Sequence, residues 1–236
     1  MLDDLLGGGV LEMSSTPFRM AEATPAWGDC TVNKVMVLLT VVCFFLMARD
    51  FVQMLPTLLS TIDRAKANVS LERSLGSARL RNRVAFVSIL PFCIVVDRFA
   101  LYDPVFLQSL PQDFSVLFVI LVLLAYWTLR HFIFVIARPA KVPSEICDTI
   151  HRAPYNYFIV LVVIMLLTVG LLSVFKCSDS VARTILLAET AAAYLFSLIR
   201  VAQFLNYNCN VFITFLYLCA LEFIPTGMLV ASAKVL

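Results

Sequence analysis

Residues 155–175 read YNYFIVLVVIMLLTVGLLSVF, which is a run of 21 residues without a charged side chain. An α-helix rises about 1.5 Å per residue, and the hydrocarbon core of a membrane is about 30 Å thick. A helix formed by this run is therefore long enough and apolar enough to cross a membrane. The run decides the class of the protein, and the rest of the chain follows the same pattern.

The composition extends the prediction beyond this one segment. Hydrophobic residues make up 61% of the chain and charged residues 14%, and the mean hydropathy is +0.92. Soluble domains carry about 25% charged residues, so a soluble domain is excluded. The formal net charge is only +2, and the basic residues lie between apolar runs. We therefore expect membrane lipids as partners and no nucleic acid.

The apolar runs predict an all-α polytopic membrane protein with six transmembrane helices. Residues 1–30 are expected to form a mostly irregular N-terminal tail, and residues 31–236 a single helical domain. Each run has roughly the 20 residues that one crossing requires. The predicted spans cover residues 31–51, 84–102, 114–137, 155–175, 181–204 and 211–231.

Several prolines mark expected irregularities, because proline cannot donate a backbone hydrogen bond. Pro56 is expected to bend or end the first helix, and Pro91 to kink the second span. Pro139, Pro143 and Pro154 predict a loop between the third and fourth spans.

The distribution of Lys and Arg predicts the orientation. With the N-terminus outside, 12 of the 18 Lys and Arg residues fall in segments on the inner side. Positively charged loops favour the cytoplasmic side. Both termini are therefore predicted to lie outside.

Glu189 and Glu222 are the least expected residues, because each lies within an apolar span. A charged carboxylate at the centre of a membrane costs roughly 2.5 kcal/mol or more. Helical rise places Glu189 about 12 Å and Glu222 about 13 Å from the outer edge. Asp97 and Arg98 fall within about one helical turn of that level. We therefore predict a polar intramembrane cluster of these four residues.

A second charged layer is predicted near the inner face. Its arginines are expected to reach the interface as anchors or as contacts of lipid headgroups. A metal or haem role for the histidine of this layer is disfavoured, because an arginine precedes it and the predicted spans contain no other histidine. The layer consists of Arg49, Asp50, Arg130, His131 and Arg200.

Three roles remain open for the polar intramembrane cluster. In a structural role, Arg98 pairs with one carboxylate and the other is protonated or hydrogen-bonded. In a transport role, Glu189 and Glu222 share a proton or cation, and the kinks at Pro91 and Pro225 supply irregular backbone. In a partner role, one of these charges meets an opposite charge on another membrane subunit.

Other motifs point away from an enzyme. The seven cysteines include no Cys-x-x-Cys pair, and no catalytic or nucleotide-binding signature occurs. We predict no cofactor and no metal site. Ala188, Ala191, Ala192 and Ala193 give the fifth span a surface of small residues, which predicts close packing of helices within the chain or with a partner.

Residues 215–225, FLYLCALEFIP, resemble the closing signature of an uncharacterised integral-membrane family of Bacteroidetes. That signature is Phe-Leu-Tyr-Leu-Cys-x-Leu-Glu-x-x-Pro, and the match covers 11 residues. The resemblance implies a bacterial inner membrane and directs attention to Tyr217, Glu222 and Pro225. It implies no activity.

These observations predict a non-enzymatic subunit or assembly factor of a cell-envelope protein complex in the inner membrane. Another membrane subunit would be its partner, and the polar intramembrane cluster would form its core. The alternative is a small secondary transporter or a proton or cation channel that uses the two glutamates.

Overall fold

The computed structural model describes residues 27–63, 75–104, 114–136, 144–208 and 211–235. Within these ranges the regular structure is entirely helical, which confirms the all-α class. Of the predicted tail, only residues 27–30 are described, and 27–29 form a turn. The helices are α1 (Thr31–Asp63), α3 (Leu75–Arg98), α4 (Ser115–Ile136), α5 (Ser144–Val174), α6 (Asp179–Asn208), α7 (Val211–Leu218), the π-helix η3 (Cys219–Phe223) and α8 (Ile224–Val235). The last three follow one another without a break, and we call them the C-terminal helix.

Five of the helices are long and apolar enough to cross a membrane, which indicates a multi-pass membrane protein. They are Thr31–Pro56, Ser115–Ile136, Ile150–Val174, Asp179–Tyr207 and Thr214–Ala233.

Helix α3 does not meet the same criterion, although a span was predicted over residues 84–102. The helix ends at Arg98, and its uncharged run from Val84 to Val96 has only 13 residues. At about 1.5 Å per residue this run measures about 20 Å. Length and composition alone therefore do not establish α3 as a sixth span.

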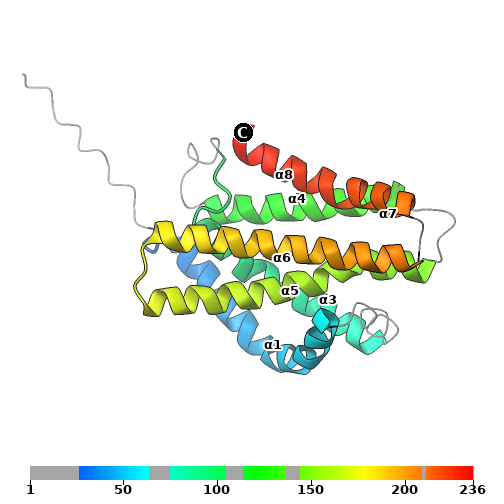
Figure 1. The fold of residues 1–236 in the computed structure, drawn as a ribbon. Helices are drawn as coiled ribbons and strands as arrows, with labels where there is room; N and C mark the ends of the chain where they lie inside the picture. Colours follow the sequence, from blue (N-terminus) through cyan, green and yellow to red (C-terminus); the bar gives the residue numbers. More distant parts are fainter. Residues whose placement is uncertain (1–26, 64–74, 105–113, 137–143, 209–210, 236) are drawn as a thin grey trace, which may run out of the picture.

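Helix α3 nevertheless lies inside the bundle. It packs against α1, α4 and α5, while the C-terminal helix packs against α6 and α4. Figure 1 shows α4, α5, α6 and the C-terminal helix lying roughly side by side, with α1 running obliquely beneath them. Val84, Ser88 and Cys93 of α3 are completely buried.

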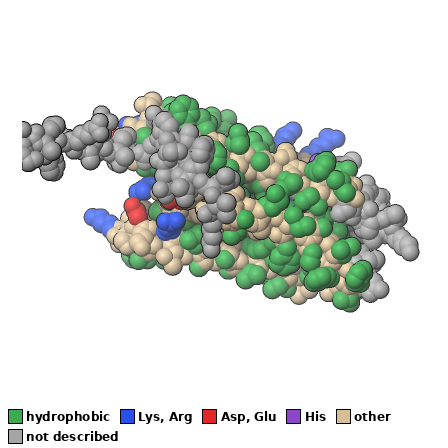
Figure 2. Space-filling view, turned by 90° about the horizontal axis from the view of Figure 1, so that it is seen from above, with side chains coloured by type: hydrophobic (Ala, Val, Ile, Leu, Met, Phe, Trp, Pro, Cys, Tyr) green, Lys and Arg blue, Asp and Glu red, His purple; other side chains and the backbone are tan. Residues whose placement is uncertain are grey.

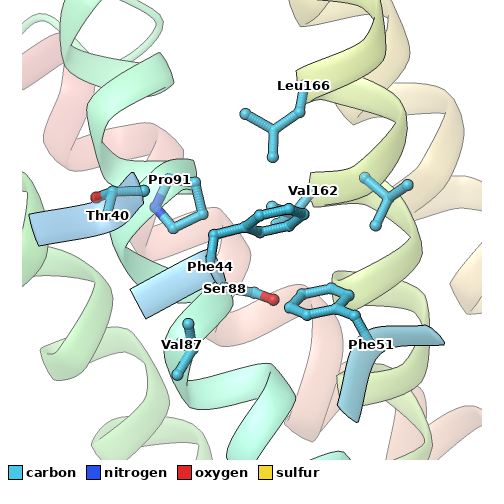
Figure 3. Close-up of a pocket in the computed structure, with 9 residues that line it drawn as sticks. Thr40, Phe44, Phe51, Val87, Ser88, Pro91, Val162 and Leu166 are labelled. Carbon is cyan, nitrogen blue, oxygen red and sulfur yellow. The ribbon is translucent and has the colours of Figure 1, made fainter. Parts of the chain in front are cut away.

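A small pocket lies between α1, α3 and α5 beside Pro91 (Figure 3). Its open space measures about 10 Å³, which is about what one water molecule needs. The hydroxyl groups of Thr40 and Ser88 at its wall donate to carbonyl oxygens of their own helices, at 2.9 and 2.8 Å. The pocket is therefore a packing defect next to a proline and not a ligand site.

Two predictions about prolines differ in outcome. Pro56 lies inside α1, which continues to Asp63 and bends near its end in Figure 1. The loop predicted at Pro154 is wrong, because α5 begins at Ser144 and contains this proline. Ile150 and Ala153, in the turn before Pro154, are buried, and this packing holds the helix together despite the lost hydrogen bond. Pro139 and Pro143 lie outside the described residues.

The outer surface is dominated by apolar side chains. On α1, Phe45 and Leu46 are 75% and 76% exposed. Figure 2 shows hydrophobic side chains spread over the face in view, with Lys and Arg gathered towards its ends. A soluble monomer rarely exposes so large an apolar surface, whereas lipid contact explains it.

Five residues, which we call the end clasp, connect four helices at one end of the bundle. The indole N–H of Trp27, before α1, donates to Asp97 at 2.5 Å, and the hydroxyl of Ser115 donates to the other oxygen of the same carboxylate. Arg98 lies 3.5 Å from Asp179 at the start of α6. The starts of α1, α4 and α6 therefore lie beside the end of α3.

The last described helix ends on the same side. The hydroxyl groups of Tyr102 and Ser232 are 2.8 Å apart, which places the end of α8 beside the chain that follows α3. Successive helices of the bundle therefore run in alternating directions.

Candidate functional site

Two deeply buried charges form an ion pair between α4 and η3. Nη2 of Arg130 lies 2.6 Å from Oε1 of Glu222, and each side chain is only 8% exposed. Either charge alone would be strongly unfavourable in an apolar bundle, but together they compensate each other. The pair therefore joins α4 to the C-terminal helix.

The π-helix η3 explains why Glu222 faces α4. Pro225 has no N–H to donate to the carbonyl of Leu221, and its ring crowds that carbonyl. The helix widens before the proline, so that the N–H of Ile224 bonds to the carbonyl of Cys219 five residues earlier. The extra residue in this turn changes the direction of the side chains that precede it. Such π-turns often occur at functional sites.

Two tyrosines surround the widened turn. The hydroxyl of Tyr194 in α6 donates to the backbone carbonyl of Glu222 at 3.2 Å. The hydroxyl of Tyr126 lies 3.4 Å from that of Thr226. Tyr126 and Arg130 are one turn apart in α4, as are Thr226 and Glu222 in the C-terminal helix. Two antiparallel polar stripes therefore meet, and a neighbouring helix supplies a donor to the irregular backbone.

The two glutamates of the predicted polar intramembrane cluster have different surroundings. Glu222 is paired with Arg130, which had been predicted in the inner-face layer, so the two predicted layers are connected. Glu189 is half-buried in α6 and lies near Thr168 of α5. Among the described residues, no hydrogen bond of good geometry reaches either of its carboxylate oxygens, and no described contact joins it to Glu222.

Asp97 and Arg98 belong to the end clasp. Their partners are Trp27, Ser115 and Asp179, none of which is a glutamate. The two residues close the end of α3, where the apolar run stops. The structure therefore does not gather the four residues of the predicted cluster in one place.

The other members of the predicted inner-face layer are spread over three helices. The guanidinium of Arg200 lies 5.1 Å above the ring of Phe196 in α6. Arg49 is exposed and Asp50 half-buried in α1, and His131 is exposed in α4. The exposed position of Arg49 on an apolar helix suits the expected contact with the membrane interface.

His151 is a residue that the sequence reasoning missed. It lies in α5 with its Nε2 atom 3.4 Å from Nδ1 of His131. Its ring stacks on Phe134, with centroids 4.1 Å apart and an angle of 16° between the planes. The missed signal was the helical spacing of Ile150, Ala153 and Tyr157, which are all buried. This spacing extends the pattern of α5 into the expected loop.

The described residues contain no group of three or more His, Cys, Asp or Glu side chains that could hold a metal ion. Comparison of the chain with known families, curated proteins and solved structures found no match. The resemblance of residues 215–225 therefore rests on those residues alone. The three residues that the resemblance singles out are all buried: Tyr217 and Pro225 lie before and after Glu222 in the C-terminal helix.

Removing one partner of the ion pair is expected to destabilise the protein more than removing both. Glu222→Leu or Arg130→Met leaves a buried charge without its partner, which costs about 3–5 kcal/mol. The double variant should recover most of this loss in the free energy of unfolding, measured by chemical denaturation in detergent. Arg49→Met, at an exposed position, is the control and should change stability by less than about 0.5 kcal/mol. If the free energy of unfolding of the double variant is no higher than that of the less stable single variant, the two charges do not compensate each other.

Proposed function

We propose that this chain is a non-enzymatic subunit or assembly factor of a protein complex of the cell envelope, located in the bacterial inner membrane. The observation that carries the proposal is a surface of exposed alanines on α6, formed by Ala188, Ala191 and Ala192, which we call the alanine surface. Its partner would be another membrane protein that packs a helix against this surface.

The alanine surface combines small size with exposure. Ala188, Ala191 and Ala192 are exposed, and Ala188 and Ala192 have the small-x-x-x-small spacing. Such spacing allows two helix backbones to approach closely in a membrane. Helix α6 uses other residues for packing inside the chain, where Leu186 and Leu205 are buried. The alanine surface therefore remains open to a second protein.

The ion pair also supports a structural role for the polar interior. Glu222 is compensated by Arg130 within the chain, and its backbone carbonyl is bound by Tyr194. A carboxylate held in this way stabilises helix packing and is poorly suited to the repeated gain and loss of a proton.

Glu189 favours a second candidate function. Its carboxylate has no hydrogen bond of good geometry among the described residues and lies about a third of the way along α6, within an apolar stretch. Unsatisfied carboxylates inside membrane helices often mark proton or cation pathways. A transporter or channel would therefore depend on Glu189 alone rather than on a pair of glutamates.

We further propose six membrane crossings with both termini outside. The end clasp supports this arrangement, because it joins the start of α1 to the end of α3. If α1 crosses the membrane, α3 must return to the same side. The excess of Lys and Arg in the segments at the opposite end supports the orientation.

Larger side chains on the alanine surface are expected to remove the partner. In the native membrane, the wild-type protein should co-purify in gentle detergent with one stoichiometric membrane protein. Ala191→Leu combined with Ala192→Leu should lose it, because the helices can no longer approach closely. Ala125→Leu, at an exposed position of α4, is the matched control and should retain it. A wild-type protein that purifies without a stoichiometric partner would contradict the proposal.

The second candidate function is tested by proton flux in proteoliposomes that contain only this protein. A subunit should give no flux above that of empty liposomes. If flux occurs and is lost in Glu189→Gln but not in Asp29→Asn, which alters an exposed carboxylate outside the end clasp, the transport function replaces the subunit function.

The crossing of α3 is tested by labelling single cysteines in a cysteine-free background. A membrane-impermeant maleimide added to spheroplasts should label Arg98→Cys but not Arg79→Cys, which lies near the other end of α3. Permeabilisation should make the second site reactive. Both residues are exposed, so burial does not limit the reaction. Labelling of both sites from the same side would rule out the crossing.

A further inference from the structure

We propose that His131 and His151 bind a divalent transition-metal ion, of the zinc, nickel or copper type, where α4 ends and α5 begins. The two side chains are 20 positions apart in the sequence, and the antiparallel packing of the two helices brings their rings together. The proposal is independent of the subunit function, because the site does not lie on the alanine surface.

The distance between the two nitrogens is the first argument. Nδ1 of His131 and Nε2 of His151 are 3.4 Å apart, whereas a hydrogen bond between nitrogen and an acceptor usually spans about 2.7–3.2 Å. Zinc binds imidazole nitrogen at about 2.0–2.1 Å with tetrahedral geometry. Two ligands of one such ion are then about 3.3 Å apart. The observed separation therefore fits a shared ion better than a direct hydrogen bond.

The environment of the two rings is the second argument. The stacking of His151 on Phe134 holds the ring in place, and the side chain is only 8% exposed. Its Nδ1 atom is buried without a partner among the described residues, and its Nε2 atom faces Nδ1 of His131. His131 is exposed. The site thus has one fixed ligand and one accessible ligand through which an ion can enter.

The nearby positive charge does not prevent binding. Arg130 is adjacent to His131 in sequence, but Glu222 compensates its charge at 2.6 Å. Arg152 follows His151 in α5, and its positive charge acts on the ring of His151, which binds a metal ion in its neutral form. Neutral imidazole ligands favour zinc, copper and nickel over magnesium and calcium.

Two histidines leave coordination positions for water or for further ligands.

The experiment uses the full-length protein in detergent, purified without a histidine tag and freed of metal by a chelator. Zinc chloride should raise the thermal unfolding midpoint of the wild-type protein, whereas magnesium chloride should not. His131→Ala should weaken zinc binding by at least about tenfold, measured by calorimetric titration. This exposed residue can be removed without opening the bundle. Phe132→Ala, which alters the exposed neighbouring residue, is the matched control and should bind like the wild type.

Cobalt(II) provides a second readout, because tetrahedral coordination gives it strong visible absorption bands. These bands should form in the wild-type protein and be lost in His131→Ala. The proposal is overturned if zinc leaves the wild-type protein unchanged, or if it binds His131→Ala as tightly as the wild type.

Discussion

The ion pair between Arg130 and Glu222 is the constraint on which the described bundle depends. Two charges in an apolar interior are tolerated only when they meet, so α4 and the C-terminal helix are fixed against each other in position and in rotation. The π-turn before Pro225 directs the carboxylate towards α4. Tyr194 then binds the carbonyl of the same residue from α6. Three helices are thus connected through one residue.

Other polar contacts join the helices at the two ends of the bundle, whereas its outward faces are mainly apolar. At one end, the end clasp closes the starts of three helices against the end of α3. At the other end, His131 and His151 connect α4 to α5. Between the ends, the outward faces carry large apolar side chains, except where α6 exposes alanines. The polar contacts that stabilise the bundle are therefore separate from the alanine surface, which is the surface proposed to bind a partner.

The helices were largely predictable from hydropathy, because a membrane crossing requires a long apolar run. The contacts within the site could not be predicted in this way. Counting residues gives the depth of Glu222 but not the direction of its side chain, and Pro225 changes that direction by widening the turn. The predicted layers also did not allow for the length of the Arg130 side chain, which reaches Glu222 of the other layer. His151 was missed because Pro154 was predicted to lie in a loop, whereas α5 contains this proline and Ile150 and Ala153 pack in the turn before it.

The most direct measurement of this account is the protonation state of Glu222 within the folded protein. Infrared difference spectra between the wild type and Glu222→Gln, recorded in detergent with glutamate isotopically labelled, resolve this one group. The account predicts that the wild-type spectrum contains the bands of an ionised carboxylate that the variant lacks. A band of a protonated carboxyl group assigned to Glu222 would show that Arg130 does not hold it as an ion pair, and would contradict the account.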